Sequence, residues 1–224
     1  DPEQFDINAD QTRLYVSNED SDQASIVDIV SGEVVKTIAV GREPEGVKLS
    51  PDGTQFYVTS ESDHDVAIID ADTGEVLSKV KVGVRPRDVI FSADNTRAYV
   101  SAEFGNSVAV IDVVNRSLIT NIQMPEGSKP MGLALSPDND TLYVANGRAT
   151  TVVKVDLTTN AVVSSVMAGV RPWGLAITAD GKFLYTANGP SNNVTVIDTN
   201  TFTVITTIAA GRSPWGVAIG PNPL

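Results

Sequence analysis

Short apolar runs separated by polar turns repeat along the whole chain. In residues 44–85 the apolar segments are "GVKLS", "TQFYVTS", "VAIID" and "EVLSKVKVG", and Gly, Pro, Asp or Asn residues bound each of them. The segments are rich in β-branched residues, and none shows the roughly 3.6-residue spacing of a helix. The pattern predicts four β-strands in each repeat, arranged as an antiparallel meander.

The strands scarcely alternate between apolar and polar positions, as "VAIID" and "VAVID" show. Such runs are typical of a sheet that is covered on both faces. Blades stacked sideways around a common axis meet this requirement, because each neighbour covers one face and only short outer edges stay exposed. The sequence therefore favours an all-β propeller of four-stranded antiparallel blades.

A tyrosine box marks every repeat. The boxes read "LYVSN", "FYVTS", "AYVSA", "LYVAN" and "LYTAN", and their tyrosines are Tyr15, Tyr57, Tyr99, Tyr143 and Tyr185. Thirteen residues after each tyrosine an aspartate closes an apolar run, at Asp28, Asp70, Asp112, Asp156 and Asp198. Because these aspartates recur in every repeat, we expect them to cap the following turn by bonding its backbone. A period in the forties that is built from strands predicts a propeller or a solenoid.

Prolines follow the same period and mark the repeat boundaries. We predict one domain over residues 1–224, with repeats at about 2–43, 44–85, 86–129, 130–171 and 172–213. Residues 214–224 then begin a further repeat, with "WGVAIG" as one extra inner strand.

The tyrosine box, the "SPDG" turn, the "VID" run and the Gly-x-x-Pro-x-Gly corner together resemble the YVTN family of β-propeller repeats, from Pro2 to Gly220. More narrowly, "GREPEGVKLSPDG", "FYVTSES" and "GVRPRDVIFSADNTRAYVS" resemble periplasmic propellers associated with PQQ-dependent (quinoprotein) alcohol catabolism. The resemblance implies a periplasmic or secreted protein, accessory to quinoprotein alcohol oxidation and without a reaction of its own. The chain opens with Asp1 and without a charged start and an apolar stretch, so we expect any secretory signal to have been removed.

The number of repeats departs from that family, whose members commonly close with seven blades. Five copies and one extra strand leave three alternatives. The chain is part of a larger propeller, or five blades close and the last strand is spare, or the incomplete edge pairs with another chain.

Charge and cysteine content narrow the classes of partner. There are 16 Lys and Arg residues against 28 Asp and Glu residues, a net charge of −12, and there is no cysteine. The acidic balance disfavours nucleic acid and anionic membrane surfaces. The absence of cysteine excludes disulfides and thiolate metal sites, and no apolar run approaches the roughly 18 residues of a membrane helix, so we expect no membrane insertion.

The loops that lead into the first strand of each repeat carry a cation just before a proline. These cations are Arg42, Arg85, Lys129, Arg171 and Arg212. In an antiparallel four-stranded blade, this loop and the loop between the second and third strands lie on the same face, so the cations would surround the mouth of the channel. Either each cation pairs with a glutamate of a neighbouring loop, such as Glu19, Glu61 or Glu103, or together they bind carboxylate or phosphate groups.

Positions that differ between repeats are the candidates for function, because a residue that is needed five times builds the blade. One loop set offers Glu45, Arg87, Asp88, Met131, Trp173 and Trp215, and the other Glu19, Glu61, Glu103, Phe104 and Arg148. We expect the two tryptophans side by side at the rim, which is typical of binding surfaces. The candidate ligand-binding residues are Arg42, Arg85, Arg87, Lys129, Arg171, Trp173, Arg212, Trp215, Glu61 and Glu103.

We predict no catalytic residues, no metal site and no cofactor. His64 is the only histidine and stands in an acidic loop without a nucleophile nearby, and the oxygen-rich loops at 18–22 and 61–65 lack the glycine spacing of a calcium loop. The sequence favours a non-enzymatic scaffold that binds a protein partner or a small anionic ligand. A lactonase-like hydrolase is the first alternative. A single-stranded nucleic-acid binder is the second, against which the net charge stands.

Overall fold

The computed structural model describes residues 1–220. The chain divides into two compact units, residues 1–121 (unit 1) and residues 122–224 (unit 2), and each is described by itself. The described residues form five four-stranded antiparallel sheets, which confirms the predicted fold class of propeller blades. That all repeats form one domain stays a prediction. None of the described residues belongs to a helix with the length and hydrophobicity that crossing a bilayer requires.

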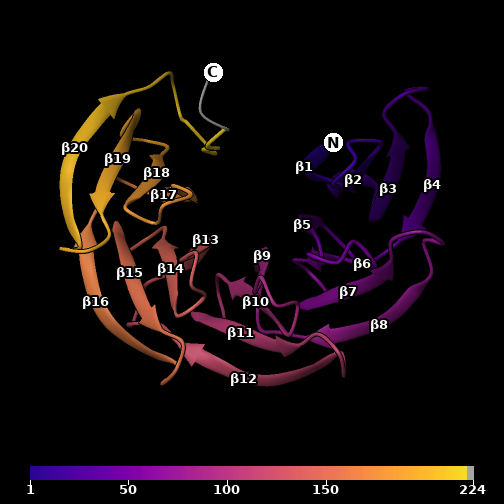
Figure 1. Ribbon diagram of the computed structural model, residues 1–224, viewed down its shortest axis with the longest axis horizontal. Coiled ribbons are helices and arrows are strands. Elements are labelled where there is room, and N and C mark those ends of the chain that lie inside the picture. The colour runs from indigo at the N-terminus through magenta and orange to yellow at the C-terminus, as the bar shows by residue number, and fades with distance from the viewer. Residues whose placement is uncertain (221–224) are drawn as a thin grey trace. The chain divides into compact units, whose positions relative to one another are not determined.

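Unit 1 contains the first three blades (Figure 1). The first blade has β1 (Pro2–Ile7), β2 (Arg13–Asn18), β3 (Gln23–Asp28) and β4 (Val34–Ala39), with a short 3₁₀ turn, η1 (Glu19–Ser21), between β2 and β3. The second has β5 (Pro44–Leu49), β6 (Gln55–Ser60), β7 (Asp65–Asp70) and β8 (Val76–Lys81). The third has β9 (Pro86–Phe91), β10 (Arg97–Ala102), β11 (Ser107–Asp112) and β12 (Ser117–Gln123). In every blade the strands pair in chain order.

Unit 2 contains two further blades. The first has β13 (Pro130–Leu135), β14 (Thr141–Asn146), β15 (Thr151–Asp156) and β16 (Ala161–Met167). The second has β17 (Pro172–Ile177), β18 (Phe183–Asn188), β19 (Asn193–Asp198) and β20 (Thr203–Ala209).

The extra inner strand expected after Pro214 is not formed. Residues 214–220 have no regular secondary structure, and residues 221–224 lie outside the described residues. A strand exists only through its ladder of hydrogen bonds, and the described segment offers one backbone bond of this kind, from Gly174 N–H to the Trp215 carbonyl oxygen at 3.2 Å. The prediction of that strand was therefore wrong.

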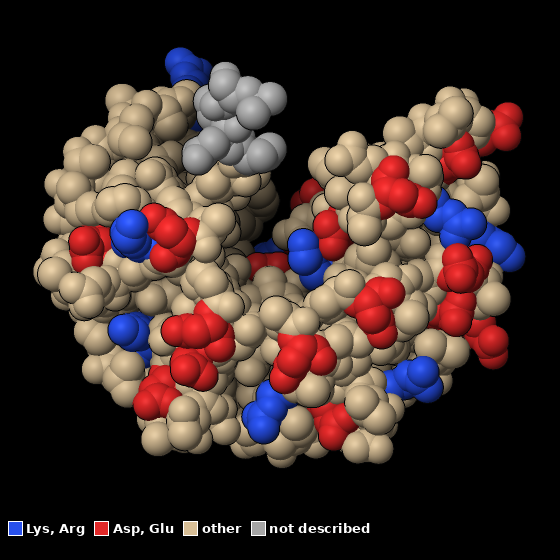
Figure 2. Space-filling view, viewed as in Figure 1, with Lys and Arg blue, Asp and Glu red and all other residues tan. Residues whose placement is uncertain are grey.

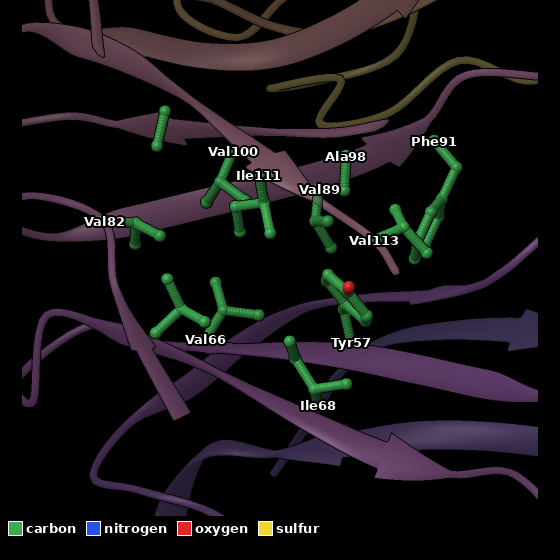
Figure 3. Packing of buried hydrophobic residues seen from close by; sticks show 12 residues of the cluster. Tyr57, Val66, Ile68, Val82, Val89, Phe91, Ala98, Val100, Ile111 and Val113 are labelled. Atoms are coloured by element: carbon green, nitrogen blue, oxygen red, sulfur yellow. The ribbon is translucent and has the colours of Figure 1, made fainter. Parts of the chain in front are cut away.

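Neighbouring blades pack face to face through apolar layers. Between the second and third blades the layer includes Tyr57, Val66, Ile68, Val100 and Ile111, all fully buried (Figure 3). Tyr57 meets Phe91 edge to face, with ring centroids 4.7 Å apart, a favourable aromatic geometry. Because each inner sheet is covered on both sides, its strands need no polar face, which explains the weak alternation in the sequence.

The aspartates that close each tyrosine-box repeat cap the next turn, as predicted. In each blade the carboxylate accepts the backbone N–H of a residue three positions later, for example Ser31 N–H to Asp28 at 2.8 Å and Thr73 N–H to Asp70 at 2.8 Å. The same contact recurs at Asp112, Asp156 and Asp198. These backbone hydrogen bonds lower the pKa of all five carboxyls. Their role is structural.

A β-bulge opens the first strand of every blade. In the second blade Pro44 faces Ser60 and Val47 faces Val58, so Glu45 and Gly46 together oppose one residue of β6. The same shift follows the proline of the other first strands. A bulge redirects the side chain that it contains, so the residue after each proline leaves the regular alternation of its strand.

Candidate functional site

The residue before each corner proline from Pro44 to Pro214 has a left-handed backbone. Glu43, Arg85, Lys129, Arg171 and Ser213 have φ between 48° and 60°, a conformation that few residues other than glycine adopt. The carbonyl of this residue accepts a hydrogen bond from the residue that follows the tyrosine box. Examples are Glu61 N–H to the Glu43 oxygen at 3.0 Å and Glu103 N–H to the Arg85 oxygen at 2.8 Å. Within each of these blades the two loop sets therefore lie on one face, as predicted.

The bulged residue of the third blade, Arg87, is at the centre of a buried ionic network in unit 1. Its guanidinium contacts the carboxyl groups of Glu45, Glu61 and Glu103, the last through Nε at 3.0 Å from Oε2. The side chains of these four residues are at most 10% exposed. Charges this far from water persist only when paired, so the network fixes the three loops relative to one another.

The carboxyl groups in this network crowd one another. Burial, and then a hydrogen bond shared with Glu61, raises the pKa of Glu45 to about 9, against the lowering effect of Arg87. Glu45 therefore keeps its proton at neutral pH. Glu61 Oε1 faces Arg87 Nη1 but accepts no hydrogen bond from a described residue.

The other corner cations of unit 1 are also paired. Arg85 Nε lies 2.5 Å from a Glu61 carboxylate oxygen, and Arg85 Nη1 lies 3.5 Å from Glu103. Its guanidinium stands over the Phe104 ring at 5.0 Å from the centroid. Arg42, 65% exposed, pairs with Asp63 at 2.8 Å. The first of the two alternatives for these cations, pairing with carboxylates of neighbouring loops, thus describes the corners of unit 1.

A cavity of about 260 Å³ opens beside this network in unit 1. Its lining consists of Glu19, Glu43, Glu61, Ser62, His64, Val84, Arg85 and Phe104. Carboxylates outnumber guanidinium groups in the lining, and Val84 and Phe104 supply apolar surface. Figure 2 shows that on the visible face acidic side chains are spread widely, with basic side chains beside many of them.

The acids at the cavity repel one another. Partial burial raises the pKa of Glu19, and a hydrogen bond with Glu3 and repulsion by Glu3 and Glu61 raise it further. A carboxyl whose pKa is raised by neighbouring acids gains most from a cation brought close to it. His64 is exposed, as predicted for a loop histidine, and its Nδ1 lies 2.7 Å from the Glu61 carbonyl oxygen.

The equivalent positions in unit 2 carry no charge. Where the blades of unit 1 have Glu61 and Glu103 after the tyrosine box, unit 2 has Gly147 and Gly189. The bulged residues Met131 and Trp173 extend over these glycines: a Cβ atom on Gly147 would lie 2.9 Å from Met131 Cγ, and one on Gly189 would lie 3.8 Å from Trp173 Nε1. Large apolar side chains thus occupy the space that ionised groups take in unit 1.

The two tryptophans lie together in unit 2, as the sequence predicted. Their ring centroids are 3.4 Å apart, and the Arg171 guanidinium stands over the Trp173 ring at 4.8 Å. Trp173 is 8% exposed and Trp215 is 54% exposed. Lys129 occupies the corner before β13, and Arg212 is exposed beyond β20.

Glu43, Ser62, His64 and Val84 line the cavity although sequence reasoning did not include them among the site residues. Glu43 had one available signal, since it is an acid at the position before the proline where the next three repeats carry a cation. Among the described residues, no group of three or more His, Cys, Asp or Glu side chains is arranged to hold a metal ion.

Comparison with known proteins bears on the fold. A family model described as a YNCE-like beta-propeller matches residues 52–221. A functionally unknown protein from Desulfotomaculum acetoxidans superimposes with a TM-score of 0.83 at 18% identity, over 97% of this chain and 74% of that one. Hydrazine synthase from Kuenenia stuttgartiensis superimposes with a TM-score of 0.72 at 18% identity, over 96% and 88%. No curated protein matches. At these identities the two solved structures show the fold alone.

Proposed function

We propose that this chain, which belongs to the YNCE-like β-propeller family, is a non-enzymatic binding protein. Its ligand is a basic segment of a protein partner, which inserts a lysine or arginine side chain into the cavity of unit 1. The single observation that carries the proposal is the lining of that cavity, where Glu19, Glu43 and Glu61 meet the apolar surfaces of Val84 and Phe104.

Electrostatics supports a cation rather than an anion in this cavity. Arg85 and Arg42 already contact carboxylates, so an incoming anion would have to displace them and would then face Glu19 and Glu43. A cation instead relieves the repulsion that raises the pKa of Glu19. The methylene groups of a lysine or arginine would pack against Val84 and Phe104 while the charged end reaches the acids.

The narrower expectations stay predictions that rest on the sequence resemblance. They are a periplasmic or secreted location, an accessory role in quinoprotein alcohol oxidation, and the pairing of an incomplete edge with another chain. The protein partner is likewise a proposal, and a small anionic ligand is proposed for unit 2.

Calorimetric titration with a short oligolysine peptide tests the cavity. We expect the double variant Glu19→Gln and Glu43→Gln to weaken binding by about 3- to 30-fold, the loss of two exposed ion pairs. The matched control is Glu33→Gln with Glu75→Gln, two exposed acids in the turns after β3 and β7, at the opposite ends of their blades. Both doubles change the net charge from −12 to −12 + 2 = −10.

Equal affinity of the two double variants would contradict the proposal, because oligolysine would then respond to net charge alone. The proposal also fails when oligolysine does not bind, or when an oligoglutamate peptide binds as tightly. The salt dependence of the titration separates the two contributions, since exposed charges are screened over about 10 Å at 0.1 M salt.

A further inference from the structure

We infer that Arg171, Trp173 and Trp215 of unit 2 form a second binding site, whose ligand is a planar aromatic carboxylate. In this arrangement the ligand ring stacks on the exposed indole of Trp215 and its carboxylate bonds the Arg171 guanidinium. The inference concerns residues other than those of the unit 1 cavity and does not depend on the function proposed for it.

The first argument is the charge of Arg171. Its structural counterpart in unit 1 is Arg85, which precedes the proline of β9 and is neutralised by Glu61 and Glu103. The counterparts of those two glutamates at the Arg171 corner are Gly147 and Gly189. Arg171 is exposed, and it takes part in no ion pair among the described residues of unit 2. Its charge is therefore available to an external anion.

The second argument is the orientation of the Arg171 guanidinium. The Arg171 guanidinium stands over the Trp173 ring at 4.8 Å from the centroid. A guanidinium that stacks on an indole leaves its N–H edge directed outward, in the forked geometry that matches a carboxylate. The backbone is held as well, since Gly189 N–H donates to the Arg171 carbonyl oxygen at 3.4 Å. A cation placed in advance loses less entropy when it binds.

The third argument is the aromatic surface beside that cation. Trp173 is buried and packs against Trp215, whose indole remains 54% exposed. Gly174 permits this close approach, because a Cβ atom on it would lie 3.0 Å from Gly216 Cα. An exposed ring held next to a guanidinium suits a ligand that has a flat apolar part and an anionic part.

The chain offers a substitution that tests the charge without replacing any of the three residues. A Cβ atom on Gly189 meets nothing nearer than 3.8 Å, and the backbone of Gly189 is not left-handed. Gly189→Glu therefore places a carboxylate where Glu103 stands beside Arg85, and it should neutralise Arg171 from within. Gly189→Gln is the matched control of nearly equal size, and Arg171→Met removes the cation directly.

The assay is titration with 2-naphthoate, followed by calorimetry and by tryptophan emission. Because Trp173 and Trp215 are the only tryptophans, the emission reports this site alone. We expect Gly189→Glu and Arg171→Met to weaken binding at least about tenfold, the loss of one charge-assisted contact, and Gly189→Gln to bind as the parent does. We expect 2-naphthalenemethanol, which lacks the charge, and cyclohexanecarboxylate, which lacks the aromatic ring, to bind more weakly than 2-naphthoate.

Three results would overturn the inference. The first is equal binding of 2-naphthoate to the Gly189→Glu and Gly189→Gln variants. The second is equal binding of 2-naphthoate and either comparison compound. The third is salt-dependent binding of oligothymidine with no binding of 2-naphthoate, which would identify the surface as a single-strand nucleic-acid platform.

Discussion

Replacing Arg87 with methionine should destabilise unit 1 far more than the same change at Arg42. Arg87 is 8% exposed and contacts three carboxyl groups that are at most 10% exposed, whereas Arg42 is 65% exposed and pairs with one carboxylate. Removing one member of a buried network leaves charges without compensation, at a cost of about 3–5 kcal/mol. An exposed pair contributes about 0–1 kcal/mol.

Urea unfolding followed by far-ultraviolet circular dichroism measures this difference, because urea, unlike guanidinium chloride, does not screen ion pairs. Both tryptophans belong to unit 2, so their emission follows that unit during the same titration.

A mutant cycle that ends in a triple variant separates the effect of the unpaired charges from that of lost packing. Adding Glu61→Gln and Glu103→Gln to Arg87→Met removes two of the carboxylates, so we expect part of the lost stability to return. The reasoning is refuted when Arg87→Met and Arg42→Met differ by less than about 0.5 kcal/mol at pH 7, the scatter of ordinary surface substitutions.

Three further outcomes follow from the same geometry. The pKa of Glu45 is raised from 4.5 to about 9 in the folded protein. Between these two pH values Glu45 ionises in the unfolded chain but keeps its proton in the fold, so the fold loses stability as the pH rises. Glu45→Gln should flatten this pH dependence of the free energy of unfolding in urea titrations. Gly132→Ala should lower the melting temperature markedly, because the new Cβ atom would lie 2.1 Å from the Trp173 carbonyl oxygen in the adjacent first strand. Gly216→Ala is the control: its Cβ atom meets no atom of the described residues within 4 Å, so the melting temperature should not change. Oligolysine should bind more tightly as the pH rises through the raised pKa of Glu19, because only the ionised carboxyl attracts the peptide; an affinity independent of pH in calorimetry would contradict this.

The strands and turns of the described blades could be predicted because their causes are local and repeated. Gly53 and Gly181 adopt φ values of 72° in the turns where the sequence repeats "DG", and each closing aspartate finds its partner three residues later. The strand after Pro214 was predicted by the same repetition and is absent, because pairing depends on a neighbouring strand that the repeat pattern does not supply.

The site was predictable only in part, because burial and pairing depend on side-chain packing in three dimensions. Pairing of Arg85 with Glu61 and Glu103 was one of two alternatives that the sequence left open. The deep burial of Arg87 and the raised pKa of Glu45 follow from the bulge, which redirects the residue after each proline toward the acids of neighbouring loops. No residue pattern in one sequence specifies the cavity that results.

Two positions of each repeat contact each other, and their residue types differ together between unit 1 and unit 2. This pair of positions determines which kind of binding surface a corner presents. The bulged residue after the proline meets the residue after the tyrosine box: Arg87 contacts Glu103 in unit 1, and Trp173 lies over Gly189 in unit 2. A carboxylate at the second position requires a cation or a proton nearby, whereas a glycine there leaves space for an indole and leaves the adjacent Arg171 without an internal anion. One backbone framework thus presents an acidic cavity in one unit and a cationic aromatic surface in the other. Exchanging the residue after the tyrosine box, as in Gly189→Glu, should therefore convert the charge of a corner without altering its backbone.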